Sequence, residues 1–285
     1  LAKDARGSRI LQEMLPQQSL ADIELSRDEL KPHLAELATH PFANYLVSRL
    51  AAVEQFADAL EAAFCNDKLA TIVCNAQGSR VVQSCMRSFD VSRAQRLARA
   101  LVGRVTECAI DTHGSWAVCT TFDGTRSALR LTASRAAAEV LARAQHGCRA
   151  FQSGVQHAAE SGMDIHQAVT VLRKSHEGLY KLSEHPYANY AVQVLLKHSS
   201  KSDCAVMVDK LLPRVFELAS SRYGSNVSEV VISIAPVDKL HPTAGLVFNQ
   251  VHRKRLSYIM AHPYGNYVLP SLLRRLDAPS ARGEA

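Results

Sequence analysis

The sequence lacks the long apolar stretches of membrane proteins and the short motifs of common enzymes. No stretch approaches the roughly 18 uncharged apolar residues that a membrane-spanning helix needs, and the start, LAKDARGSRI, has no apolar signal-peptide region. None of the patterns G-x-G-x-x-G, G-x-S-x-G, H-E-x-x-H or a phosphate-binding P-loop occurs. We therefore expect a soluble protein of the cytoplasm or nucleus that has no catalytic activity and needs no cofactor.

The cysteines follow no regular pattern. There are seven of them, an odd number, scattered from Cys65 to Cys204 without a C-x-x-C pair. This argues against a disulfide framework and a structural zinc site, and it favours a reducing compartment.

The composition is that of a folded protein with a large core. Hydrophobic residues make up 47% of the 285 residues and charged residues 21%, which excludes a disordered chain. Lys and Arg outnumber Asp and Glu by 33 to 27, a formal net charge of +6. Such a balance favours polyanionic partners, although an ordinary basic surface would look the same.

A short string recurs along the whole chain: a small residue, then Asn, Ser or Cys, then in most copies Tyr or Arg. Successive small residues are 33 to 41 residues apart. Apolar residues keep one helical phase around them, as Leu34 and Leu37 do before Ala43 and Leu46 and Val47 after it. Each unit therefore predicts two to three helices. We call the small residues markers; they are Gly7, Ala43, Gly78, Gly114, Gly147, Ala188, Gly224 and Gly265.

The starts of the helices that follow the markers have their own signal. His-Pro precedes three of the markers, at 40–41, 185–186 and 262–263. We expect the Pro to lie in the first helical turn, and the Asn or Ser after the marker to occupy unpaired backbone donors. The histidines recur with the repeat instead of converging, so we expect them to pack at repeat junctions and to bind no metal.

Because one such unit cannot bury its apolar face alone, neighbouring units must stack. The fold class is therefore predicted to be all-α, a curved solenoid, or superhelix, of eight three-helix repeats in a single domain over residues 1–285. Only six residues precede Gly7, so the first repeat is expected to lack most of its opening helix.

Further helices are expected outside the marked segments. Residues 93–104 and 203–215 predict a third helix of their repeats or the next opening helix, and the Ala-rich residues 135–144 predict a plain helix. The two 41-residue spacings hold extra residues. These are expected in loops near 157–164 and 237–245.

Three positions after each marker carry polar or flat side chains that a core would not require. They are the first, second and fifth residues after the marker, and we call them the triplet. Near a helix N-terminus these positions share one edge, which we expect to be exposed. In chain order the triplets are Ser8, Arg9, Gln12; Asn44, Tyr45, Ser48; Ser79, Arg80, Gln83; Ser115, Trp116, Cys119; Cys148, Arg149, Gln152; Asn189, Tyr190, Gln193; Ser225, Asn226, Glu229; and Asn266, Tyr267, Pro270.

These triplets resemble those of the Pumilio (PUF) family, in which S/C-R-x-x-Q, N-Y-x-x-Q and S-N-x-x-E recognise bases. The resemblance covers essentially the entire chain. It implies a monomeric protein that binds single-stranded RNA with about one base per repeat.

Hydrogen-bond chemistry supports this interpretation. The edge of uracil offers acceptor, donor and acceptor, which the two carboxamides of Asn189 and Gln193 can meet. One Gln, such as Gln83 or Gln152, can pair with adenine in a bidentate manner. Guanine alone presents two adjacent donors, and the carboxylate of Glu229 accepts both.

The second member of the triplet is flat in seven of eight repeats, with Asn226 as the exception. Planar groups spaced one repeat apart can stack on unpaired bases, and each stacked base contributes about 1 to 3 kcal/mol. Trp116 could alternatively belong to the core, but its position as the second member of a triplet favours stacking.

In the family the RNA runs antiparallel to the protein. The last repeat therefore reads the 5′ base, and carrying over each triplet in this order predicts the site 5′-UGUANAUA-3′, with Glu229 at the second base, Asn189 and Gln193 at the third, and Ser115 and Cys119 at the fifth. Three departures weaken the recognition of single bases: Ser48 is too short to replace Gln at the uracil edge, and Pro270 offers no side-chain hydrogen bond and could kink its helix. Ser115 with Cys119 recognises an edge weakly and leaves the fifth base undefined.

By resemblance, the function is post-transcriptional. The expected targets are 3′ untranslated regions of mRNA, whose translation or stability the protein would lower in the cytoplasm. Deadenylase or translational repressor proteins are expected on the outer face, and no membrane is expected as partner. Two alternatives remain: a nucleolar PUF-like protein in ribosomal RNA processing, which tolerates degenerate triplets, and a protein-binding scaffold of the HEAT or armadillo type.

Overall fold

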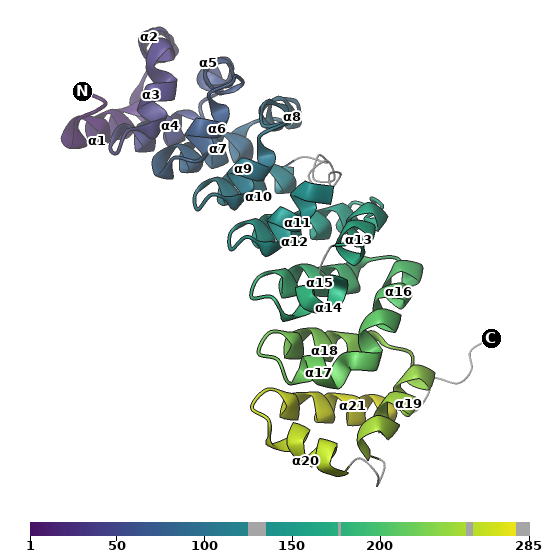
Figure 1. The fold of residues 1–285 in the computed structure, drawn as a ribbon. Helices are drawn as coiled ribbons and strands as arrows, with labels where there is room; N and C mark the ends of the chain where they lie inside the picture. The colour runs from purple at the N-terminus through teal and green to yellow at the C-terminus, as the bar shows by residue number, and fades with distance from the viewer. Residues whose placement is uncertain (125–134, 176–177, 249–252, 278–285) are drawn as a thin grey trace. The chain divides into compact units, whose positions relative to one another are not determined.

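The computed structural model describes residues 1–124, 135–175, 178–248 and 253–277. Throughout these residues the regular structure is helical and no strand occurs, which confirms the predicted all-α class (Figure 1). No helix among them is long and apolar enough to cross a membrane. Contacts divide the chain into two compact units, Leu1–Leu131 with Gln145–His157 and Thr132–Ala144 with Ala158–Ala285. The prediction of a single domain over residues 1–285 stays a prediction.

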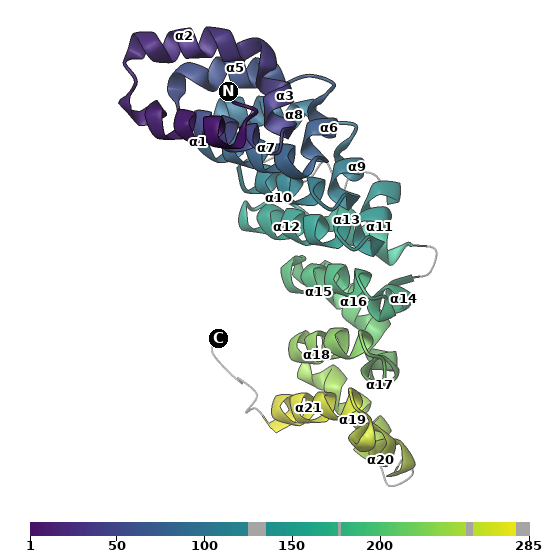
Figure 2. The same cartoon turned by 90° about the vertical axis from the view of Figure 1, so that its left-hand side faces the viewer.

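Seven triplets lie at the beginning of an α-helix, which we call the reader helix, and the eighth spans a 3₁₀ turn and the first turn of its reader helix. In the first unit α1, α4, α7 and α10 pack against one another in chain order, and in the second unit α15, α18 and α21 do the same (Figures 1 and 2). The reader helices are α1 (Ala5–Met14), α4 (Ala43–Leu50), α7 (Ala76–Ser88), α10 (Gly114–Gly124), α12 (Gly147–Glu160), α15 (Ala188–His198), α18 (Gly224–Ile234) and α21 (Val268–Asp277), the last preceded by the 3₁₀ turn η7 (Gly265–Tyr267).

Two further layers of helices complete each stack. Short helices precede the markers: α3 (Leu34–Thr39), α6 (Leu69–Val73), α9 (Val105–Ile110), α14 (Gly178–Glu184), α17 (Val215–Ala219) and α20 (Arg253–Ala261). Third helices follow the reader helices: α2 (Leu20–Leu30), α5 (Ala57–Phe64), α8 (Val91–Ala100), α13 (His166–Arg173), α16 (Lys201–Leu211) and α19 (Val237–Phe248). Helix α11 (Arg135–Arg143) lies where the Ala-rich segment predicts a helix. Within each unit the chain is thus a helical repeat solenoid.

The prediction of loops for the extra residues is wrong in one place and partly wrong in the other. Residues 237–245 lie in α19, although Pro242 stands inside that helix. Its buried residues Leu240, Ala244 and Val247 form an apolar face that packs on α20 and α21, and this packing outweighs the cost of the proline. Of residues 157–164, the first four belong to α12 and only the rest form a turn.

The apolar phase around the markers is confirmed in most repeats. Leu34, Leu37, Leu46 and Val47, for example, are all at most 3% exposed. Ile10 departs from the pattern and is 42% exposed. Among the described residues no reader helix comes before α1, so none covers this side of it.

The markers are small because the reader helix begins against the last turn of the preceding short helix. A Cβ atom on Gly78 would lie 2.3 Å from the carbonyl oxygen of Ile72, and one on Gly114 would lie 2.4 Å from that of Cys108. A larger side chain would therefore push the reader helix, and its triplet, away from the stack.

Candidate RNA-binding surface

Seven of the eight markers follow, three residues later, a side chain that caps the start of the reader helix; Ala144, before Gly147, is the exception. His40 Nδ1 accepts hydrogen bonds from the backbone N–H groups of Phe42 (3.2 Å) and Ala43 (3.4 Å). Asn75 Oδ1 accepts in the same way from Gln77 and Gly78, at 2.9 Å each. Asp4 and Asp111 repeat this arrangement ahead of Gly7 and Gly114, and His185 and His262 ahead of Ala188 and Gly265.

Two sequence expectations about these helix starts are wrong. Pro41 lies in the turn before α4, which begins only at Ala43. The side chain of Asn44 does not accept from the unpaired donors, because it is already inside the helix and turns back toward the carbonyl groups of the cap turn. The donors are taken by His40 instead.

The first member of the triplet is buried, so the expectation of one exposed edge is wrong for this position. In the first seven triplets its residue exposure is between 0% for Asn189 and 9% for Ser225, whereas Asn266 is exposed. The buried polar atoms are bonded to cap turns. Asn44 Nδ2 donates to the carbonyl oxygens of His40 and Pro41, both at 2.8 Å, and Ser8 Oγ donates to that of Phe42 in the next repeat at 2.9 Å.

The third member of the triplet is held by the first, one helical turn away. Gln193 Nε2 donates to Asn189 Oδ1 at 3.0 Å. Gln83 Nε2 donates to Ser79 Oγ at 3.2 Å, and Gln12 does the same with Ser8. These Gln side chains are half-buried, so part of each carboxamide faces solvent in a defined position.

The second members stand out from the surface. Tyr45, Trp116, Tyr190 and Tyr267 are 53%, 52%, 45% and 65% exposed, so Trp116 is not a core residue. Arg9, Arg80, Arg149 and Asn226 are exposed as well. Successive second members can touch, since the Arg149 guanidinium carbon lies 4.1 Å from the centroid of the Trp116 ring.

The three departing triplets also differ in structure. Pro270 lies in the first turn of α21, where its missing N–H group removes no hydrogen bond of the helix. The 3₁₀ turn η7 directly precedes this helix. Ser115 Oγ donates to the carbonyl oxygen of Thr112 at 3.4 Å, and Cys119 is half-buried beside it. Ser48 is half-buried too. Glu229 of the seventh triplet is exposed on α18.

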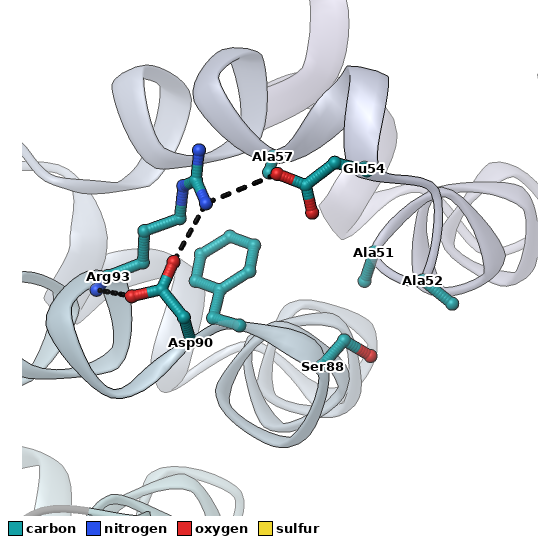
Figure 3. Close-up of a pocket in the computed structure, with 8 residues that line it drawn as sticks. Ala51, Ala52, Glu54, Ala57, Ser88, Asp90 and Arg93 are labelled. Atoms are coloured by element: carbon teal, nitrogen blue, oxygen red, sulfur yellow. Dashed lines mark hydrogen bonds and ion pairs between the residues drawn. The ribbon is translucent and has the colours of Figure 1, made fainter.

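A pocket of about 390 Å³ in the first unit contains no triplet residue (Figure 3). It lies where α4 and α7 end, and Arg93 of α8 reaches across it to Asp90 (2.7 Å) and to Glu54 (3.4 Å). Hydrogen bonds from Arg93 hold the pKa of the Asp58 carboxyl below its ordinary value, and the bond from Arg96 lowers the pKa of Glu61. The described residues contain no group of three His, Cys, Asp or Glu side chains that could hold a metal ion.

Comparison with known proteins gives relatives of similar sequence along nearly the whole chain. It is 26% identical over 283 residues to the putative pumilio homolog 8, chloroplastic, of Arabidopsis thaliana, covering 96% of this chain and 53% of that protein. It is 23% identical over 307 residues to fem-3 mRNA-binding factor 2 of Caenorhabditis elegans, covering 88% of this chain and 45% of that protein. The chain thus spans about half the length of these relatives.

Solved structures share the fold. The crystal structure of PUF-8 in complex with PBE-RNA matches with a TM-score of 0.82 and 22% identity, covering 97% of this chain and 82% of that one. The Puf4 RNA binding domain, bound to the HO endonuclease RNA 3′ UTR recognition sequence, matches with a TM-score of 0.79 and 24% identity, covering 97% of this chain and 90% of that one.

The family model of the Pumilio-family RNA binding repeat matches segments in both units. The matched residues are 1–22, 33–47, 68–101, 140–161, 179–212, 214–229 and 257–279, which is more than half of the chain. The reader helices, the exposed column of flat side chains and this match agree, and the chain belongs to the Pumilio family of RNA-binding repeat proteins.

Proposed function

We propose that this protein binds single-stranded RNA in a sequence-specific manner, one base per repeat, at sites of the form 5′-UGUANAUA-3′. The observation that carries the proposal is the column of exposed flat side chains on successive packed reader helices. Tyr45, Arg80, Trp116 and Arg149 form it in the first unit. Except for Trp116, whose third member is Cys119, each stands beside a polar third member, so a stacked base would meet a hydrogen-bonding group at its edge.

The chemistry of the third members supports the choice of bases. Glu229 is the only carboxylate among them, and a carboxylate suits the two adjacent donors of guanine. The carboxamides of Asn189 and Gln193 lie within hydrogen-bond distance of each other, and between them they can offer both a donor and an acceptor to uracil. Gln83 and Gln152 offer a single carboxamide, which suits adenine. Ser115 and Cys119 leave the fifth base undefined.

Related proteins support a proposal for the biological role. Its members are RNA-binding proteins and not enzymes, which supports the expectation that this chain has no catalytic activity. Puf4 is bound to a 3′ UTR recognition sequence in its structure, and one relative is an mRNA-binding factor. We further propose that the protein acts as a monomer on 3′ untranslated regions in the cytoplasm, where it lowers translation or mRNA stability and recruits deadenylase or repressor proteins on its outer face.

A charge-neutralising substitution at Glu229 tests the assignment of bases. Glu229→Gln replaces the acceptor-only edge by a mixed one, so the preference for guanine at the second RNA base should fall on the order of tenfold while other bases are unaffected. Competition binding with the four second-base variants of UGUANAUA measures it. Glu24→Gln, the same change on exposed α2, is the control.

Selection of RNAs from a random pool tests the function as a whole. Recovery of UGUA-containing sequences is expected. Equal affinity for an unrelated polypyrimidine would argue for the degenerate, ribosomal RNA-type alternative in the nucleolus. Failure of the folded protein to bind any RNA would favour a protein-binding scaffold.

A further inference from the structure

In the seven reader helices that have a side-chain cap, the type of cap residue differs with the first member of the triplet, which follows four residues later. Asn is preceded by a His cap and a Pro in all three of its repeats, whereas Ser is preceded by Asp, Asn or Ser. The pairs are His40 and Asn44, His185 and Asn189, His262 and Asn266; Asp4 and Ser8, Asn75 and Ser79, Asp111 and Ser115, Ser221 and Ser225. The cap turn and the first member thus vary as one unit.

We propose that the His-Pro turns ahead of Asn44 and Asn189 are specificity-determining elements. They fix the amide of the Asn with its oxygen directed toward the base, and this orientation makes the repeat prefer uracil over cytosine. The inference rests on the proposed function, since it adds His185 and Pro186 as positioning residues to the site of the third RNA base.

The turn is held by the histidine ring. His185 Nδ1 accepts from the N–H groups of Tyr187 and Ala188, both at 3.2 Å, so the ring hydrogen of the neutral imidazole is on Nε2. The ring also lies 6.0 Å from that of Tyr187, in a tilted arrangement. Proline favours an extended conformation of the residue before it, and the equivalent His40 has φ −80° and ψ 138°.

This turn leaves the Asn amide only one orientation. Asn189 Nδ2 donates to the carbonyl oxygens of His185 and Pro186, both at 2.9 Å. A primary amide nitrogen has two hydrogens, which is enough for both bonds. The oxygen Oδ1 must then point the other way, where it accepts from Gln193 Nε2 at 3.0 Å. A flipped amide would set its oxygen against two carbonyl oxygens.

An amide fixed in this way discriminates between pyrimidines. Uracil presents the N3–H donor at the centre of its edge, and Asn189 Oδ1 can accept it once Gln193 moves to a neighbouring carbonyl of the base. Cytosine presents an unprotonated N3, an acceptor that would face the acceptor Oδ1. If the turn were loose, the amide could rotate and donate to cytosine, and the discrimination would be lost.

The Ser-type repeats supply a matched control. Asn75 caps α7 through the same two backbone positions as His185 does in α15. Ser79 Oγ, however, donates to the backbone carbonyl oxygen of His113 in the turn of the next repeat, at 2.8 Å. Loss of the Asn75 cap should therefore weaken the helix start without releasing Ser79 or its Gln83 partner.

The experiment compares His185→Ala with His185→Asn and Asn75→Ala in competition binding to RNAs with uracil or cytosine at the third base. His185→Ala should lower the preference for uracil over cytosine on the order of fivefold, because the amide of Asn189 is then free to rotate. His185→Asn restores an acceptor and should retain the preference. Asn75→Ala should leave base preference unchanged both at the sixth RNA base, which the triplet after Asn75 is proposed to read, and at the third base. Thermal unfolding verifies that all variants are folded.

Two results would overturn the inference: an unchanged uracil preference in His185→Ala, or an equal loss of third-base preference in Asn75→Ala. Asn189→Ala separates this failure from that of the proposed function. If Asn189→Ala abolishes the uracil preference and His185→Ala does not, only the positioning role is wrong. If Asn189→Ala changes nothing at the third base, the assignment of this repeat to that base is itself wrong.

Discussion

The guanidinium group of Arg149 is stacked on the indole of Trp116, with its central carbon 4.1 Å from the ring centroid. These are the second members of successive triplets, on α10 and α12 of the first unit. A base can enter between them only if they separate. An exposed cation–π contact contributes about 0.5 to 1 kcal/mol, whereas stacking of a base contributes about 1 to 3 kcal/mol, so insertion of a base should be favoured.

The fluorescence of Trp116 should therefore report RNA binding. It is the one tryptophan of the chain, so its emission comes without background. We expect a saturable change in intensity when UGUANAUA RNA is titrated in, because a base replaces the arginine on the indole face. An RNA without UGUA should produce the change only at much higher concentration. Unchanged emission at saturation, with binding verified independently, would mean that no base enters this position.

Loss of a stacking ring should weaken binding without changing the sequence that is bound. Tyr190→Ala removes a ring that is 45% exposed on α15, and we expect about 1 to 3 kcal/mol weaker binding to every RNA. Measurement of affinities for UGUANAUA and its third-base variants tests this. If the preference at one base collapses while overall affinity holds, Tyr190 recognises an edge and does not stack.

Two glycines in helices should respond to alanine in opposite directions. Gly78→Ala should destabilise the protein by about 1 to 3 kcal/mol, because the new Cβ would meet the Ile72 carbonyl oxygen at 2.3 Å. Gly245→Ala, in α19 with nothing within 4 Å, should stabilise it by up to about 1 kcal/mol. Denaturant unfolding measures both. Stabilisation by Gly78→Ala would show that the reader helix can move away without cost.

The ion pairs of Arg93 should contribute to stability only while their carboxyl groups are ionised. Arg93 bonds Asp58 and Asp90 at 2.7 Å each. The Arg93 side chain lowers the pKa of Asp58, and the Arg93 backbone N–H lowers that of Asp90. A lowered folded-state pKa means that the stabilisation is fully present above the ordinary value of about 4 and is lost as the pH falls through the folded-state pKa.

Arg93→Ala should accordingly lower the Tm at pH 7 and have little effect near pH 2. Melting curves across this range, with Arg99→Ala on the same helix as the control, test it. A Tm difference that persists undiminished in acid would assign the loss to packing of the Arg93 stem.

Much of this protein could be predicted from local sequence patterns. The phase of residues such as Leu34 and Leu46 identifies helix faces, because side chains three or four positions apart lie on the same side of a helix whatever surrounds it. The exposed second members, Trp116 and Tyr190 among them, follow from the same periodicity. The length of α19 could not be predicted in this way, because Pro242 is a local signal against a helix and only packing on α20 and α21 outweighs it.

The sequence by itself determined the repeat, the all-α class and the positions of the triplets, since each depends on spacing within about one repeat. Only the tertiary structure decided the roles within a triplet. Asn189 is buried and oriented by the His185 turn, Ser79 is bonded to the following repeat, and Arg149 covers Trp116. These relationships join atoms across turns and neighbouring repeats, and the direction of a hydrogen bond or a stacked ring depends on distances that no linear spacing contains.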